Sequence, residues 1–137
     1  MRHLSLFSGI GGFDLAAERA GMTTVGQVEI DKHARSVLER WWPDVPRWED
    51  IHDVTAGDVG PADVISGGFP CQDYSVAGKR GGLAGDRGEL WWQFHRLIAE
   101  CRPTWIIGEN VPGLLSSHRG RDFAAILSSL VELGYGT

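Results

Sequence analysis

Residues 63–72 read Asp-Val-Ile-Ser-Gly-Gly-Phe-Pro-Cys-Gln, a short apolar run followed by a glycine pair, a proline and a cysteine. The apolar run is typical of a buried strand, and we expect the glycine pair to end it with a sharp backbone turn. A second buried strand is predicted over residues 104–108, directly before Glu109. If the two strands run parallel, Cys71 and Glu109 reach the same edge of one sheet, where open α/β sheets bind their ligands.

Segments with the character of strands and of helices alternate along the chain. Strands are predicted over residues 3–7, 24–28, 63–66 and 104–108. Helices are predicted over residues 12–20, 32–42, 89–101 and 122–133. The stretch before the third strand is irregular and acidic, and a long glycine-rich loop is expected over residues 67–88. This order predicts an α/β fold with a parallel sheet and helices on both faces.

Length and charge place few limits on function. The 137 residues have the length of one domain. A formal charge of −5 and a pI of about 5.4 are ordinary for a soluble protein and do not indicate nucleic-acid binding. The basic residues of the second half could contact phosphates, although a solvated surface explains them equally well.

Cysteine and histidine usage gives no indication of a metal site. The two cysteines lack a paired spacing and the five histidines are scattered, so neither a zinc site nor a structural disulfide is expected. No apolar run has the length of a membrane span, and the amino terminus lacks the apolar core of a signal peptide. We therefore expect a cytoplasmic protein without membrane contact.

The two cysteines differ in their surroundings. A free cysteine is most often a small buried hydrophobe, and Cys101, near the end of a predicted amphipathic helix, is expected to be structural. Cys71 is flanked by Gly, Pro, Gln, Asp and Ser, which are typical of an accessible loop and favour a reactive thiol. Pro70 restricts the backbone of that loop.

A glycine-rich turn, Phe-Ser-Gly-Ile-Gly-Gly-Phe at residues 7–13, joins the first strand to the first helix. Glycines there permit positive φ and close approach of a ligand, but the spacing is not that of a dinucleotide site, and a tight structural turn is an equally good explanation. Glu29 follows the next strand about 20 residues later, where a carboxylate can accept hydrogen bonds from both ribose hydroxyls.

Taken together, these segments resemble the cytosine-5 DNA methyltransferases that use S-adenosylmethionine. The resemblance lies in residues 7–13, 28–31, 49–51, 68–72, 75–78, 87–88 and 109–111. It implies a Rossmann-like S-adenosylmethionine-dependent methyltransferase fold. It also implies that the cofactor is bound by Phe7, Gly9, Ile10, Gly11, Gly12, Glu29, Ile30, Asp50, Ile51, Gly68, Pro70 and Leu90. Double-stranded DNA would be contacted from a closing loop by Gln72, Ser75, Lys79 and Arg87.

The resemblance further implies covalent catalysis. The Cys71 thiolate would attack carbon 6 of cytosine, which makes carbon 5 nucleophilic enough to accept the methyl group. Glu109 would contact ring nitrogen 3 and the exocyclic amino group. The target cytosine must leave the duplex to reach both groups. A base then removes the hydrogen from carbon 5, and the sequence does not identify that base.

The sequence departs from the family where it ends. Members continue into later strands, a motif with paired arginines, a target-recognition region and a final helix, so residues 1–137 are expected to be the catalytic and cofactor-binding part, truncated at the carboxyl end. Three alternatives stay open. The chain is a methyltransferase part completed by a missing or separate chain, a non-catalytic module that binds the cofactor or a partner, or part of an enzyme acting on cytosine in RNA.

Overall fold

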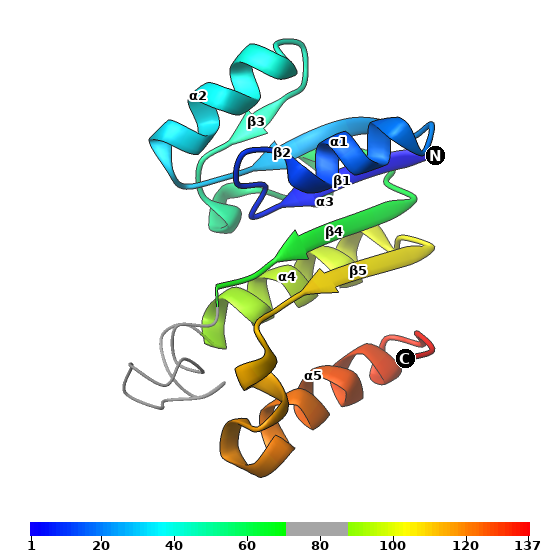
Figure 1. Ribbon diagram of the computed structural model, residues 1–137. Coiled ribbons are helices and arrows are strands. Elements are labelled where there is room, and N and C mark those ends of the chain that lie inside the picture. Colours follow the sequence, from blue (N-terminus) through cyan, green and yellow to red (C-terminus); the bar gives the residue numbers. More distant parts are fainter. Residues whose placement is uncertain (71–87) are drawn as a thin grey trace.

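The computed structural model describes residues 1–70 and 88–137, and these form an open α/β layer structure (Figure 1). The strands are β1 (Arg2–Leu6), β2 (Thr23–Val28), β3 (Arg47–Trp48), β4 (Val64–Gly68) and β5 (Trp105–Glu109). The α-helices are α1 (Gly12–Arg19), α2 (Lys32–Trp41), α3 (Ala56–Val59), α4 (Gly88–Cys101) and α5 (Arg121–Glu132). The described residues also form the short 3-10 helices η1 (Ile51–Asp53), η4 (Pro112–Leu115) and η5 (Ser117–Gly120).

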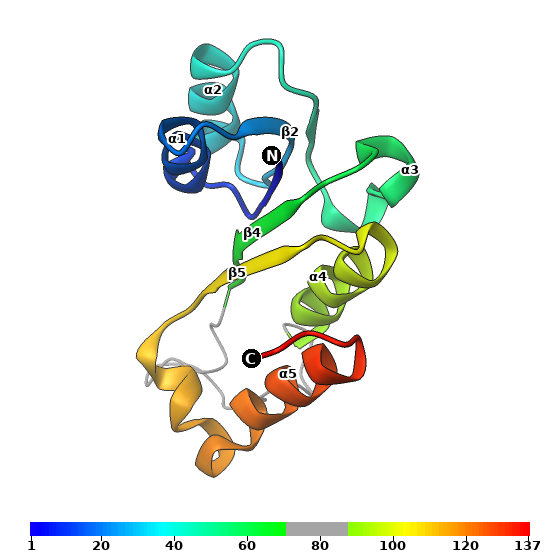
Figure 2. The same ribbon diagram turned by 90° about the vertical axis from the view of Figure 1, so that its right-hand side faces the viewer.

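All five strands are parallel, in the order β3-β2-β1-β4-β5. Figure 2 shows α1 and α2 on one side of this sheet and α3 and α4 on the other. α5 packs beside α4, where His95 Nε2 lies 3.2 Å from the backbone oxygen of Ser129. The predicted parallel sheet with helices on both faces is confirmed.

The core lies around β1 and β4, because both strands have neighbours on each edge and helices over each face. Leu4, Leu6 and Ile65 are fully buried there. On the α4 side, Phe94 is also fully buried and packs against Phe69, with ring centroids 6.2 Å apart. This packing fixes the carboxyl end of β4, where residues predicted to be functional begin.

The glycine pair does not make a sharp turn out of β4, contrary to our expectation, but forms the last two residues of the strand. Gly67 and Gly68 continue the strand and pair with Gly108 and Glu109 of β5. A Cβ on Gly67 would lie 2.9 Å from the backbone oxygen of Leu6, so glycine is needed for close packing rather than for a turn.

β5 is not the buried strand that we expected. Trp105 is 63% exposed and Ile107 is 44% exposed. The reason is that β5 is the last strand of the sheet and, within residues 1–70 and 88–137, pairs only with β4.

The stretch after α2 is more ordered than we predicted. It contains β3, η1 and α3, which are two, three and four residues long. Elements this short leave no hydrophobic periodicity in a sequence. They matter because they carry Asp50 to the edge of the sheet.

Candidate functional site

A cavity of about 200 Å³ opens at the carboxyl ends of β1, β2 and β4. It is lined by Phe7, Val28, Glu29, Ile30, Glu49, Asp50, Ile51, Gly68, Pro70 and Leu90. All of these except Val28 and Glu49 are among the cofactor-binding residues that the sequence predicts. The fold thus brings residues from five separate segments to one place.

Glu29 directly follows β2 and is largely buried. Its Oε2 accepts a hydrogen bond from the Gly9 backbone N–H at 2.7 Å, and its Oε1 accepts one from the Asp31 N–H at 2.8 Å. Each carboxylate oxygen has a second lone pair, so both can still accept from another donor. The backbone therefore holds Glu29 in one orientation while leaving it able to bind a pair of hydroxyls.

The glycine-rich turn contributes to the cavity only in part. Phe7 lines the cavity, and Gly9 reaches it through its hydrogen bond to Glu29. Ile10, Gly11 and Gly12 instead line a separate groove between α1 and α2. Gly11 has φ of 93°, and a Cβ on it would lie 2.4 Å from the Trp42 ring, so this glycine is required by the turn itself.

Asp50 forms the N-cap of η1 and lies on the cavity wall. Its Oδ1 accepts from the His52 backbone N–H at 2.9 Å and lies 2.5 Å from His52 Nδ1. Both hydrogen bonds lower the pKa of Asp50 below its usual value, and the one from the backbone N–H has the larger effect. Ile51, next in the chain, is buried in the core beneath the cavity.

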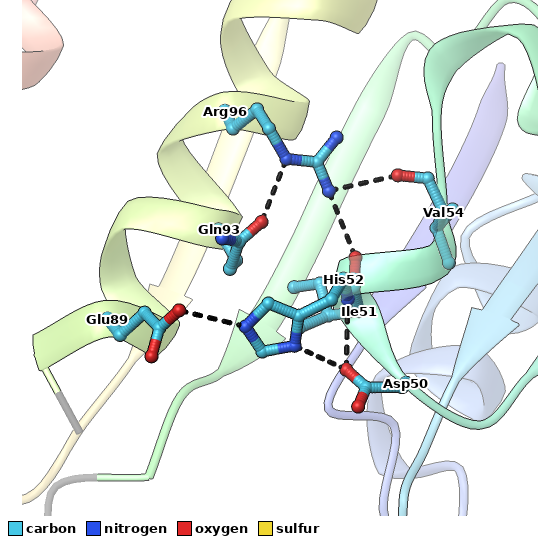
Figure 3. A network of polar contacts seen from close by, with 7 residues as sticks. All are labelled: Asp50, Ile51, His52, Val54, Glu89, Gln93 and Arg96. Carbon is cyan, nitrogen blue, oxygen red and sulfur yellow. Dashed lines mark hydrogen bonds and ion pairs between the residues drawn. The ribbon is translucent and has the colours of Figure 1, made fainter. Parts of the chain in front are cut away.

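His52 and Arg96 connect η1 to α4 (Figure 3). His52 Nε2 lies 3.3 Å from Glu89 Oε1. The Arg96 guanidinium donates to the backbone oxygens of Ile51 and Val54 at 3.0 and 2.9 Å. No local sequence pattern predicts these contacts, since the residues lie 37 to 45 positions apart.

Glu109 ends β5 opposite Gly68, the last residue of β4. A Cβ on Gly68 would lie 2.7 Å from Glu109 Oε2, so the carboxylate lies over the glycine backbone. Asn110 Nδ2 donates to the backbone oxygen of Phe69 at 3.2 Å and ties the two strand ends together. Glu109 is exposed, and it borders the segment that leads into Cys71.

Several predicted site residues lie outside the described part of the chain. They are Cys71, Gln72, Ser75, Lys79 and Arg87. Cys101 ends α4 and packs against the core, and burial raises the pKa of its thiol, as suits a structural cysteine.

Among the described residues no cluster of three or more His, Cys, Asp or Glu side chains could hold a metal ion. In the same residues, every helix is too short or too polar to span a membrane.

Comparison with known proteins identifies the family. Residues 1–137 match the profile described as C-5 cytosine-specific DNA methylase. The chain belongs to this family. The predicted Rossmann-like methyltransferase fold and the resemblance that led to it are therefore confirmed.

Relatives of this chain include type II methyltransferases of bacteria. The type II methyltransferase M2.BsuMI of Bacillus subtilis is 40% identical over 98% of this chain, and M.Eco47II of Escherichia coli is 40% identical over 96%. The chain spans only 35% and 32% of the length of these two relatives.

Solved structures agree with this assignment. An E. coli prophage protein assigned as a DNA modification methyltransferase is 29% identical, with a TM-score of 0.80 over 96% of this chain and 38% of that protein. DNMT2 from Spodoptera frugiperda, solved as a mutant, is 25% identical, with a TM-score of 0.68 over 93% of this chain and 40% of that protein.

Proposed function

We propose that residues 1–137 are the cofactor-binding and catalytic part of an enzyme that transfers a methyl group from S-adenosylmethionine to carbon 5 of cytosine in DNA. One observation carries the proposal. Gly68 lines the cavity, and the Glu109 carboxylate lies close over its backbone. A cofactor in the cavity and a base held by Glu109 would therefore meet at the residue that comes three positions before Cys71.

The cavity wall suits an adenosine with a charged tail. Glu29 would accept the two ribose hydroxyls through its free lone pairs. Ile30 and Ile51 would lie against the adenine, and Asp50 would accept from the adenine amino group. Gly68, Pro70 and Leu90 would border the methionine end, at which the bound cofactor supplies an electrophilic methyl group.

Cys71 and Glu109 would act on the cytosine ring. The thiolate adds to carbon 6, and Glu109 donates to or shares a proton with nitrogen 3, so the electron pair reaches carbon 5. After methylation, loss of the carbon-5 hydrogen and of the thiolate restores the aromatic ring. The asparagine that follows Glu109 would keep the two strand ends in register during these steps, because it bonds to the backbone of Phe69.

DNA is the proposed substrate, with the target base rotated out of the helix. Gln72, Ser75, Lys79 and Arg87 would contact the nucleic acid. The overall charge of −5 does not favour strong binding to phosphates by this part alone.

We further propose that activity needs a second polypeptide part, either continuous with this chain or separate. The outer edge of β5 is the proposed docking place. A cavity of about 540 Å³ lies between β5, α4 and α5, and apolar side chains such as Ile106, Phe123 and Leu130 line it. Trp91 also lines this cavity, and its indole Nε1 is buried and has no hydrogen-bond partner among the described residues. An added strand would cover the apolar surface and offer a carbonyl to the indole N–H.

Covalent capture on DNA that contains 5-fluorocytosine tests the proposal. Fluorine at carbon 5 prevents the final elimination, so an enzyme that has transferred its methyl group stays attached and migrates as an adduct on a denaturing gel. The chain is assayed with S-adenosylmethionine, alone and with any product of an adjacent gene. We expect the adduct to disappear in Cys71→Ala and to persist in the matched control Cys101→Ala.

The outcomes separate the alternatives. Capture by the chain alone would show that no second part is required. Capture on fluorinated RNA but not on DNA would move the substrate to RNA. Cofactor binding without capture under any condition would instead favour a non-catalytic module.

A further inference from the structure

The imidazole of His52 lies between Asp50 and Glu89, two residues far apart in the sequence (Figure 3). Nδ1 lies 2.5 Å from Asp50 Oδ1, and Nε2 lies 3.3 Å from Glu89 Oε1. Glu89 is in the first turn of α4, and the next residue, Leu90, lines the cavity. One ring thus connects the adenine side of the proposed site to its methionine side.

The backbone of this turn does not depend on His52. Arg96 binds the backbone oxygens of Ile51 and Val54, and its own position is fixed by Gln93 Oε1 at 2.8 Å and Glu100 Oε1 at 2.8 Å. These contacts hold η1 against α4 through backbone atoms and do not involve the His52 ring. The His52 ring therefore acts on side chains, and removing it should leave the turn folded.

Among the described residues, both side-chain hydrogen bonds of Asp50 are made by Oδ1. Within the described residues, Oδ2 has no hydrogen-bond partner and is left available on the cavity wall. A carboxylate fixed through one oxygen presents the other in a defined direction, which lowers the entropy lost when a ligand binds.

We propose that His52 is a positioning residue for the cofactor, which it serves by orienting the Asp50 carboxylate and tying it to the first turn of α4. This inference rests on the proposed cofactor site. It assigns a role to a residue that would not itself touch the cofactor, and it makes cofactor binding depend on the charge of one imidazole.

Protonation decides how many carboxylates the ring can hold. An imidazolium donates from both nitrogens, whereas a neutral imidazole donates from one. Hydrogen bonding, first to Asp50 and then to Glu89, raises the pKa of His52 above its ordinary value of about 6.5. Below that pKa both contacts form. As the pH rises through the pKa of His52, the ring loses one proton. Nδ1 keeps its proton because of the short contact to Asp50, and Nε2 then has no proton to donate to Glu89.

The other charged groups near the His52 ring do not offer Glu89 a second donor in place of Nε2. Asp53 lies on the same turn and adds negative charge. Arg96 is occupied by backbone oxygens and by Glu100. Glu49 precedes Asp50 and is paired with Arg35 at 3.0 Å.

Calorimetric titration of the chain with S-adenosylmethionine between pH 6 and 8.5 tests the proposal. The cofactor's own amino group titrates in this range, so the quantity compared is the ratio of wild-type to variant affinity at each pH. In His52→Asn the amide can still reach Asp50 but is too short for Glu89. We expect the variant to bind about threefold to tenfold more weakly at pH 6 and to match wild type at pH 8.5.

Two further variants sharpen the result. In Glu89→Gln the amide can donate to a neutral ring, so the affinity at pH 8.5 should equal or exceed that of wild type. His118→Asn is the matched control, because His118 Nδ1 also contacts a carboxylate, Asp122, at 2.8 Å but lies away from the cavity. Its ratio should stay near one at every pH.

The result also distinguishes this inference from the proposed function. Wild-type binding with a His52→Asn ratio that does not change with pH would overturn the role of His52 and leave the cofactor site standing. Absence of binding by the folded wild-type chain at every pH would overturn the cofactor site and, with it, this inference.

Discussion

Strands β2, β1 and β4, which form the closed half of the sheet, each pair on both edges, whereas β5 pairs on one edge only among the described residues. β1 pairs on both edges, and the buried carboxylate of Asp14 beneath it accepts from Ser5 Oγ at 2.9 Å and Gln27 Nε2 at 2.8 Å. At β5, by contrast, one edge has no partner among the described residues, and a cavity separates the strand from α5. The closed half contains the fully buried strand residues and borders the proposed cofactor cavity, whereas β5 is where we propose that a second part docks.

Two isoleucines on adjacent strands measure this difference most directly. Ile65 in β4 is fully buried, whereas Ile107 in β5 is 44% exposed. We expect Ile65→Ala to lower the free energy of unfolding by about 2 to 5 kcal/mol, because it leaves a cavity in the core. Ile107→Ala should cost less than about 1 kcal/mol, since it removes surface that water already reaches. Urea unfolding followed by circular dichroism gives both values.

Equal costs for the two variants would contradict the comparison. They would mean that something covers β5 in the isolated chain in solution, for which a second copy is the simplest candidate. Sedimentation of the wild-type chain at two concentrations is the control that detects such pairing.

The closed half was also the half that could be predicted from sequence. Strands β1, β2 and β4 were predicted to within one or two residues from the apolar residues that each contains, although β1 has no β-branched residue. The same pattern misled us at β5, where Ile106 and Ile107 suggested burial. An apolar run indicates that a strand has side chains to bury. It does not indicate whether the strand or helix that would cover them is present.

The candidate site was predictable where a residue follows a strand directly. Glu29 and Glu109 were placed correctly at strand ends because the carboxyl ends of parallel strands share one edge. Ile10 was assigned to the cofactor by its motif alone, and in the structure it lines the groove between α1 and α2, so its assignment stays a prediction. The His52 contact to Glu89 depends on how η1 meets α4, which no local pattern encodes.

Asp14→Asn tests whether the buried polar contacts support the closed half. An amide can keep its oxygen on Gln27 only by turning its N–H₂ group toward Ser5, whose hydroxyl must then accept instead of donate, so the hydroxyl proton loses its buried acceptor and Gln27 bonds to a neutral oxygen. We expect a loss of about 1 to 3 kcal/mol in the free energy of unfolding. The exposed Asp44→Asn is the matched control and should change stability by less than about 0.5 kcal/mol. A neutral result for Asp14→Asn would show that this network adds nothing to the fold.

Glu29→Ala tests whether the closed half also binds the cofactor. The substitution removes the acceptor of the Gly9 and Asp31 N–H groups and, in the proposed site, of the ribose hydroxyls. We expect at least about a tenfold loss of S-adenosylmethionine affinity by calorimetry, equivalent to about 1.4 kcal/mol. Glu49→Ala is the control, because Glu49 lines the same cavity but is 67% exposed and paired with Arg35. If both variants bind like wild type, Glu29 is not the ribose ligand.

The smallest effect is expected from His3, whose ring lies between three strands of the closed half. Nδ1 lies 3.1 Å from Thr24 Oγ1 and Nε2 lies 2.7 Å from Ser66 Oγ. Burial lowers the pKa of His3, although Asp14 acts in the opposite direction. A histidine with a lowered folded pKa stabilises the protein fully above its unfolded pKa of about 6.5, and this contribution is lost as the pH falls through the folded value.

Urea unfolding at pH 7 and pH 5 should therefore show a stability loss at pH 5 that is smaller in His3→Gln than in wild type. His52 has its pKa shifted the opposite way and lies on the surface, so His52→Asn should leave most of this loss in place. A loss of the same size in His3→Gln would mean that other groups carry the acid sensitivity. In that case the pH dependence of stability would not separate the buried His3 in the sheet from the surface His52 beside the cavity.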